Sequence, residues 1–380
     1  MKKALGIYIH VPFCLKKCNY CDFCSFAGVD DDVKAKYVDA LCRHIRLYRD
    51  TCSCHTVDSI YFGGGTPTLL PIDLFEKIFA ALCESFDVSE SAEITVECNP
   101  KTADVTYFKA LHKMGVNRLS LGVQSANDNE LRALGRVHTW GDSVDAFFDA
   151  RRAGFENISA DIMFGIPEQT EKSLENTLER VTELSPTHIS AYGLIIEPGT
   201  PFFVNYEKLV LPDEDSEYNM YTGTRRWLSQ HGFVQYEISN FALPGKESFH
   251  NLKYWRREEY LGFGVSAHSF FDETRFACPS SLNEYICGNY TGERSRISPN
   301  DAASEFVMLG MRLTEGVSES EFRSRFGKGF EESYGDALDR FVKSGFVVRK
   351  GGRCAFTDSG FYVSNTVLSE ILSFDSSDDT

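Results

Sequence analysis

The chain is 380 residues long, with 42% hydrophobic residues, a net charge of −16 and a pI near 5.1. This length is enough to bury a large core without disulfide support. The acidic balance argues against nucleic acid or an anionic membrane surface as the main partner, because both require a basic footprint. No run approaches about 18 consecutive apolar residues, so we expect no integral membrane segment. Four of the 12 cysteines fall within residues 14–24 and the others are scattered, which favours reduced thiols and a cytoplasmic location over a secreted disulfide framework.

Short β-rich runs alternate with helical stretches through the first 200 residues. Six such runs occur, at residues 5–10, 57–62, 93–98, 117–123, 157–163 and 188–194. Their spacing suits βαβ crossovers, and their near-continuous apolar character suits a parallel sheet covered on its outer face. The sequence therefore predicts an α/β fold in which residues 1–200 form a partial (β/α)6 parallel barrel. The chemistry of such barrels collects at the carboxyl ends of the strands.

The pattern changes after residue 200. Residues 201–297 are rich in aromatic residues and glycine and show no long helix, which predicts a sheet extension or cap on the barrel. Residues 301–313, 318–326 and 331–344 are predicted helices, and two strand-like runs around a Lys-Gly-Gly turn follow them. We therefore expect a small winged-helix-like helical domain over residues 298–370. The acidic residues 371–380 are expected to form a frayed tail.

Three cysteines follow the first predicted strand at Cys-x-x-x-Cys-x-x-Cys spacing: Cys14, Cys18 and Cys21. Three thiolates on one short loop can hold a single 4Fe-4S cluster and leave one iron open, so that a small molecule can chelate it. A zinc knot is the alternative, and it requires a fourth ligand such as Cys24 or His10. The cluster is favoured because the polar segments further along the chain have no role in a zinc knot. A fourth cysteine would block the open iron, so we expect Cys24 to be a bystander.

Polar residues also stand at the ends of the later strands. The three glycines of YFGGGTPTLL let the backbone approach a ligand closely. Glu97 and Gln124 can bond polar groups such as ribose hydroxyls, Arg136 can pair with a carboxylate, and Asp161 can complete the pocket. For each of them, an ordinary polar role at a strand end is the alternative. Their joint order along the chain favours a binding site.

These motifs resemble a known family. The cysteine spacing is similar to that of the radical SAM superfamily, in which S-adenosylmethionine (SAM) occupies the open iron. The set YIHVPFC, CNYCDF, FGGGTPT, ECNP, LGVQS, DIMFGIP and HNLKYW resembles the oxygen-independent coproporphyrinogen III oxidase family over nearly the whole chain. The resemblance implies that Cys14, Cys18 and Cys21 hold the cluster. It also implies a SAM pocket lined by Tyr8, Tyr20, Gly64, Gly65, Thr66, Glu97, Gln124, Arg136 and Asp161.

Within that family, three observations favour the HemW-type heme-chaperone branch over the true oxidases. Only seven residues precede Tyr8, whereas the oxidases carry an N-terminal extension that helps enclose their substrate. Phe23 stands where the oxidases place a fourth cysteine, with Cys24 one position later. Finally, HNLKYW looks like the His-Asn-x-x-Tyr-Trp motif associated with heme binding in the chaperone branch.

This last motif has a physical meaning for heme binding. His250 offers an imidazole as an axial iron ligand, while Tyr254 and Trp255 can cover the macrocycle. The alternative is that His250 forms hydrogen bonds in a buried turn and that the two aromatic residues belong to the core. For His268, in GVSAHSF, we expect a structural role.

The predicted function is therefore to bind heme and transfer it to an acceptor protein, with the cluster and SAM forming a regulatory or structural site. By resemblance alone, the acceptor is a respiratory enzyme. Two enzymatic alternatives remain open. One is oxidative decarboxylation of coproporphyrinogen III through a 5'-deoxyadenosyl radical, and the other is radical SAM chemistry on a different substrate. The sequence leaves open whether the chain forms a homodimer and whether heme is held covalently.

Overall fold

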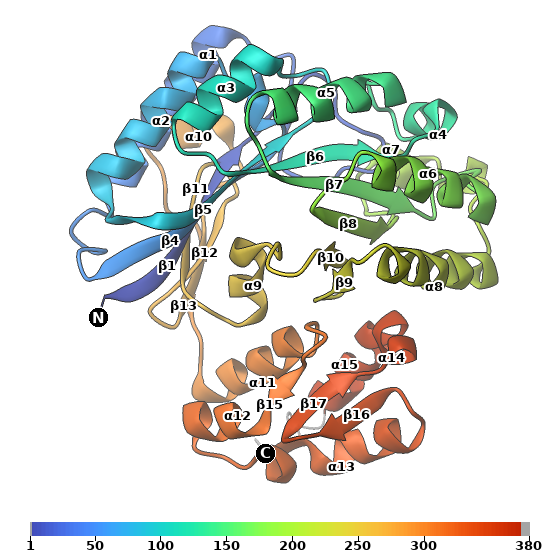
Figure 1. The fold of residues 1–380 in the computed structure, drawn as a ribbon. Helices are drawn as coiled ribbons and strands as arrows, with labels where there is room; N and C mark the ends of the chain where they lie inside the picture. Colours follow the sequence, from blue (N-terminus) through green and yellow to red (C-terminus); the bar gives the residue numbers. More distant parts are fainter. Residues whose placement is uncertain (1, 374–380) are drawn as a thin grey trace.

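One large sheet dominates the computed structural model, which describes residues 2–373 (Figure 1). Its 12 strands follow the order β14-β13-β12-β11-β1-β4-β5-β6-β7-β8-β10-β9. The six predicted strands are confirmed. Most of their ends lie within two residues of the predicted positions. They lie next to one another and run parallel, as β1 (Lys3–Val11), β4 (His55–Gly64), β5 (Val88–Cys98), β6 (Arg118–Gln124), β7 (Asn157–Phe164) and β8 (His188–Gly193).

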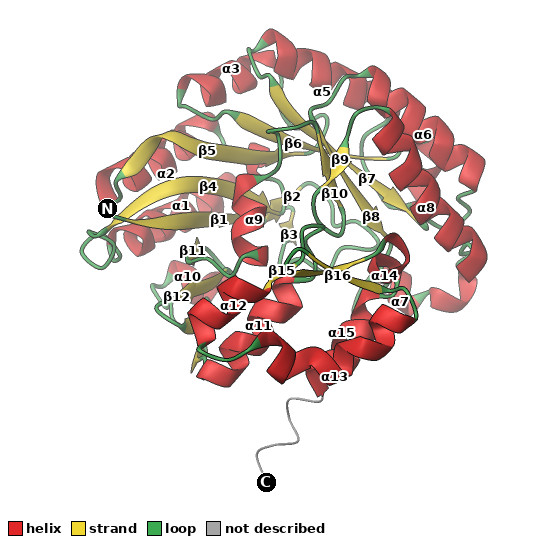
Figure 2. Ribbon diagram, turned by 60° about the horizontal axis from the view of Figure 1, so that its bottom comes forward, coloured by secondary structure: helices red, strands yellow, loops and turns green. Residues whose placement is uncertain are grey.

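Helices connect these strands and cover the outer face of the curved sheet, as Figure 2 shows. They are α1 (Asp31–Arg46), α2 (Ile72–Ser85), α3 (Val105–Lys113), α4 (Asp128–Ala133), α5 (Trp140–Arg152) and α6 (Glu171–Glu183). In α6, the residues that face the sheet are Leu174, Thr177, Leu178 and Val181. Their spacing of three and four residues places them on one face of the helix. The parallel strands are buried on both sides, which confirms the predicted partial barrel.

Strands from the middle of the chain extend both edges of this parallel sheet. β11 (Tyr260–Phe263) pairs parallel with the free side of β1. From β11 the sheet continues antiparallel through β12 (His268–Phe271), β13 (Thr274–Ala277) and β14 (Arg294–Arg296). At the other edge, β10 (Asn240–Ala242) pairs antiparallel with β8 and carries β9 (Val234–Gln235). The predicted sheet extension is therefore confirmed and occupies both edges.

The expectation of no long helix after residue 200 is wrong. α8 (Glu214–Gln230) is a helix of 17 residues. The Asp213 side chain caps it by accepting a hydrogen bond from the Ser216 amide at 2.8 Å, and acidic residues fill its first turn, where they stabilise the helix dipole. Most of its surface is polar and its buried face is narrow, so the apolar periodicity was too weak to reveal it.

Short elements complete this part of the chain. They are β2 (Phe13–Cys14), β3 (Phe26–Ala27), the 3-10 turns Pro67–Leu69 and Tyr206–Lys208, α7 (Pro201–Val204), α9 (Phe249–Trp255) and α10 (Leu282–Ile286). The HNLKYW segment thus forms helix α9. Lys253 anchors it to the sheet, since this almost fully buried ammonium lies 2.8 Å from Asp58 and 3.1 Å from Glu258.

The C-terminal segment forms a helical unit with its own small sheet, drawn apart from the large sheet in Figure 1. Three helices, α11 (Pro299–Gly310), α12 (Glu319–Phe326) and α13 (Phe330–Lys343), accompany a three-stranded antiparallel sheet. Its strands are β15 (Val317–Ser318), β17 (Arg353–Phe356) and β16 (Val347–Lys350). The predicted helices followed by a hairpin are confirmed. The domain boundaries near residues 200, 297 and 370 remain predictions.

Two further helices, α14 (Asp358–Tyr362) and α15 (Ser364–Ser373), follow the hairpin. Residues 371–373, which the sequence analysis assigned to the tail, belong to α15, and Ile371 is fully buried. Residues 374–380 lie outside the described part of the chain. Within residues 2–373, no helix is long and apolar enough to span a bilayer.

Candidate cofactor and ligand site

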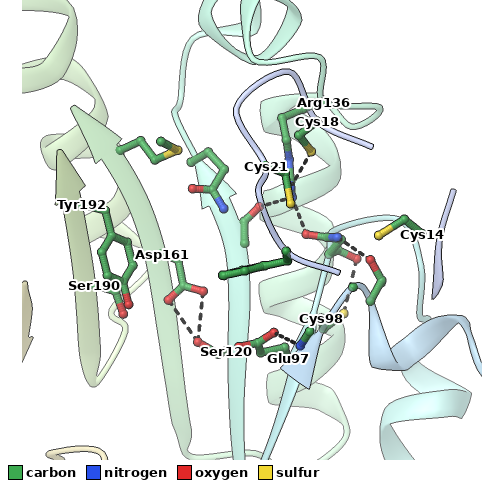
Figure 3. Close-up of a pocket in the computed structure, with 18 of the residues that line it drawn as sticks. Cys14, Cys18, Cys21, Glu97, Cys98, Ser120, Arg136, Asp161, Ser190 and Tyr192 are labelled. Carbon is green, nitrogen blue, oxygen red and sulfur yellow. Dashed lines mark hydrogen bonds between the residues drawn. The ribbon is translucent and has the colours of Figure 1, made fainter. Parts of the chain in front are cut away.

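A cavity lies at the carboxyl ends of the parallel strands, where barrels of this kind place their sites. Figure 3 shows 18 of the residues that line it. Most of the predicted site residues meet here although they are far apart in the sequence: Cys14, Cys18, Tyr20, Cys21, Gly64, Gly65, Thr66, Glu97, Gln124, Arg136 and Asp161. We call this the first cavity. Tyr8 and His250 do not line it.

The cysteine loop connects β2 to β3, and these two strands pair with each other through Phe13 and Phe26. Its three predicted ligands, Cys14, Cys18 and Cys21, are free and half-buried. No three His, Cys, Asp or Glu side chains among residues 2–373 converge tightly enough for a single metal ion. A four-iron cluster is wider than an ion and binds thiolates spaced around it. Three thiols on one loop that faces a cavity therefore fit such a cluster.

Glycine at position 65 is required by this loop. A Cβ atom there would lie 2.7 Å from the Phe13 carbonyl oxygen and 3.0 Å from the Cys14 sulfur, closer than atoms tolerate. Gly64 has φ +112°, a conformation that side chains rarely adopt, and its amide donates to Glu97 at 3.2 Å. The glycine-rich segment thus lets the end of β4 lie directly beneath Cys14.

Two carboxylates face the first cavity, Glu97 from β5 and Asp161 from β7, and β6 lies between these strands. Glu97 accepts hydrogen bonds from the Tyr61 hydroxyl at 2.9 Å and from the Gly64 amide. Burial, together with the nearby charge of Asp161, raises the pKa of Glu97 to about 7. Asp161 accepts from the Ser120 hydroxyl at 3.0 Å (Figure 3), and burial raises its pKa too. Both side chains can accept hydrogen bonds from hydroxyl groups of a ligand.

Arg136 holds the opposite wall against the cysteine loop. Its Nη1 donates to the Cys18 sulfur at 3.5 Å and its Nη2 to the Gly122 carbonyl at 2.8 Å. The side chain also donates to Asn99. Its Nε is buried and has no hydrogen-bond partner in the structure, so one donor of the guanidinium remains for a ligand.

Arg118 also lines the first cavity, and the sequence analysis missed it. It opens β6, its side chain is only 1% exposed, and its Nε and Nη1 atoms have no hydrogen-bond partner in the structure. Its charge lowers the pKa of Asp161 and Glu97 against the larger, opposite effect of their burial. The available signal was an arginine at the start of an otherwise apolar strand, in NRLSLGVQ.

We expect Arg118→Met to lower the free energy of unfolding by about 3 kcal/mol at pH 8, because it leaves buried carboxylates without their cation. The loss should be smaller at pH 6, where protonation of Glu97 relieves the charge. Urea denaturation at the two pH values measures both effects, with Arg118→Lys as the charge-retaining control. An equal loss at both pH values would contradict this role.

Comparisons with known proteins agree with the family that the sequence motifs predict. A family model described as the radical SAM superfamily matches residues 8–181, and one described as the HemN C-terminal domain matches residues 297–363. "Heme chaperone HemW" of Bacillus subtilis is 36% identical over 98% of this chain and 99% of its own length. "Heme chaperone HemW" of Escherichia coli is 32% identical over 97% and 98%. The chain belongs to the HemW family.

The fold of this HemW family member is also similar to that of a solved structure. The structure titled "Coproporphyrinogen III oxidase (HemN) from Escherichia coli is a Radical SAM enzyme" matches it with a TM-score of 0.87. That match covers 98% of this chain and 91% of the other, and the two sequences are 24% identical. At this sequence identity, the match shows a shared fold only. The shared fold and the radical SAM family match at residues 8–181 together confirm the predicted type of barrel.

The histidine of the HemW-type motif is buried in this structure. His250 is 0% exposed, and its ring nitrogens lie 2.9 Å from the Ser59 hydroxyl and 2.8 Å from the Tyr254 hydroxyl. Burial lowers its pKa to about 3, so the ring is neutral. The geometry is therefore that of the hydrogen-bonding alternative, and the axial-ligand role of His250 remains a prediction. Its neighbour Asn251 lines the first cavity.

A second cavity adjoins the first and shares Phe23, Gly64 and Glu97 with it. Tyr8, which was predicted to contact SAM, lines this second cavity, and so does Tyr254 of the HemW motif. Cys24, which was expected to be a bystander, also lines this cavity, together with His10 and His268. The Cys24 thiol points to the Ser280 carbonyl, 3.7 Å away.

Proposed function

We propose that this protein binds heme and transfers it to an acceptor protein. The observation that carries the proposal is the similarity to proteins named "Heme chaperone HemW", which extends over nearly the full length of both chains. The motif at residues 250–255 and the residues of the two cavities support it. The sequence predicts a respiratory enzyme as the acceptor and a cytoplasmic location, and both belong to the proposal. The free state of all 12 cysteines is consistent with the location.

The proposal includes a 4Fe-4S cluster held by Cys14, Cys18 and Cys21, with SAM in the first cavity. The cluster and SAM, when bound, supply one-electron chemistry. The carboxylates of Glu97 and Asp161 accept hydrogen bonds from ribose hydroxyls. The free Nε of Arg136 offers a donor to the SAM carboxylate. Tyr20, Gly64, Gly65, Thr66 and Gln124 complete the walls.

Two parallel titrations on one sample test the proposal. After anaerobic reconstitution of the cluster, heme binding is followed by visible absorbance, and coproporphyrinogen III turnover is assayed with SAM and a reductant. We expect one heme per chain and no porphyrin product. The shared fold of the HemN structure makes oxidation of coproporphyrinogen III the competing function. Formation of protoporphyrinogen would establish that function instead.

A further inference from the structure

A histidine that binds heme iron needs a ring nitrogen free of other bonds, beside a space that admits the macrocycle. His250 uses both ring nitrogens within the protein. His10 does the same, through the Tyr8 hydroxyl at 3.0 Å and the Cys24 carbonyl at 2.8 Å. His138 lies at a cavity of only about 20 Å³. These three rings are therefore unsuited to heme as the protein stands.

His268 meets both conditions. Its side chain is exposed and lines the second cavity, whose volume is about 510 Å³. That volume lies within the range of cofactor-sized sites. No hydrogen bond or ion pair of its ring occurs among the interactions found within residues 2–373. We infer that the second cavity is the heme site and that His268 is the axial iron ligand, an inference that rests on the proposed heme binding.

The walls of the second cavity suit a flat apolar ring. Tyr8, Phe23, Tyr254 and Tyr260 line it. Such rings pack well against a macrocycle, and the three tyrosine hydroxyls keep polar partners. Tyr254 and Tyr260 lie edge to face, with their ring centroids 4.5 Å apart. Phe23, at 64% exposed, is a large apolar side chain left uncovered on the cysteine loop. Bound heme would cover it.

The backbone fixes His268 at this cavity. His268 opens β12, the strand that turns back antiparallel beside β11. A Cβ atom at Gly262 would lie 2.2 Å from the His268 carbonyl oxygen, so the turn can fold this closely only over a glycine. Because β11 runs parallel to β1, its carboxyl end lies at the same edge of the sheet as the cysteine loop. His268 is thus held beside the cluster loop by regular structure.

With His268 as the iron ligand, the HemW motif contributes to heme binding indirectly. Tyr254 forms one wall of the second cavity, and its hydroxyl lies 2.8 Å from the His250 ring. Ser59 fixes that ring from the other side. His250 is accordingly a positioning residue that orients Tyr254. Its loss should weaken heme binding without changing the axial ligand.

Charge sets the orientation of the ligand. Asp22 and Glu97 are the carboxylates that line the second cavity, and no lysine or arginine lines it. The cavity offers no cation to pair with the heme propionates and Asp22 repels them, so they should point out to solvent. Affinity then depends on the iron bond and on the aromatic contacts.

The test is a heme titration of the reconstituted full-length chain, in wild-type form and with His268→Ala or His250→Ala. We expect His268→Ala to weaken binding about tenfold or more and to lose the absorbance spectrum of histidine-ligated heme. Added imidazole should restore that spectrum by filling the space left by the ring. His250→Ala should keep the spectrum and lose affinity. Circular dichroism confirms that both variants are folded.

The outcomes separate this inference from the proposed function. If wild-type protein binds no heme, the proposed function fails. If wild-type protein binds heme, an unchanged spectrum in His268→Ala overturns the inference and leaves the function standing, and a lost spectrum in His250→Ala would then make His250 the ligand. Loss of the spectrum in His268→Ala without rescue by imidazole would also overturn it, because the histidine would then act through the fold rather than on the iron.

Discussion

Replacing Cys14, Cys18 and Cys21 together with alanine should abolish the broad iron-sulfur absorbance of the reconstituted protein. The three thiols stand on one loop that faces the first cavity, and no other cysteine side chain of that loop points there. Cys24 provides the matched control, because its thiol points to the Ser280 carbonyl and lines the second cavity instead. Cys24→Ser should therefore keep the full absorbance. Iron content and visible spectra after anaerobic reconstitution measure both variants.

Retention of a full cluster in the triple variant would overturn the assignment of the ligands. Loss of the cluster in Cys24→Ser would make Cys24 a fourth ligand. That result would close the open iron on which SAM binding depends, and it would return the zinc-type alternative to consideration.

Glu97→Gln should stabilise the protein at pH 8 by up to about 3 kcal/mol, since one pKa unit corresponds to about 1.36 kcal/mol. The pKa of Glu97 is raised from 4.5 to about 7, chiefly by burial. Between these values the folded chain holds a proton that the unfolded chain has released, so wild-type stability falls as the pH rises through this window. Glutamine resembles the protonated form and carries no such penalty. The two proteins should accordingly differ little below pH 4.5.

Urea denaturation at pH 5 and pH 8 measures this difference, and Glu237→Gln is a matched control. Burial raises the pKa of Glu237 to about 7 as well, but Glu237 does not line the first cavity. Both variants should therefore gain stability at pH 8, while only Glu97→Gln should weaken SAM binding. A stability difference independent of pH would contradict the raised pKa of Glu97. An unchanged SAM affinity would remove Glu97 from the proposed site.

The barrel could be predicted because its signals are local. Each parallel strand is a short apolar run that ends in polar or glycine residues, as in SLGVQS and ITVECNP. The carboxyl ends of parallel strands meet at one edge of the sheet, so Glu97, Gln124 and Asp161 could be assigned to one site without coordinates. Helix α8 was missed because its core-facing stripe is narrow and its surface polar.

The remaining features depend on contacts between distant parts of the chain. Nothing in residues 260–263 reveals that they pair with β1. The burial of His250 and the free ring of His268 arise in the same way, from the packing of α9 on β4 and from the turn into β12. A motif identifies which side chains matter, but it does not say which ring nitrogen is already bonded. For that reason, the sequence favours His250 as the iron ligand, whereas the contacts of the two rings favour His268.

The position of β1 has a consequence for synthesis on the ribosome. β1 lies between β4 and β11, but residues 65–259 separate those two partners in the chain. At ~5–20 residues per second, a nascent chain needs ~10–40 s to make that stretch. During this time one side of β1 has unpaired backbone groups, which can recruit a foreign strand. A translation pause before residue 260 should therefore increase aggregation of the newborn protein.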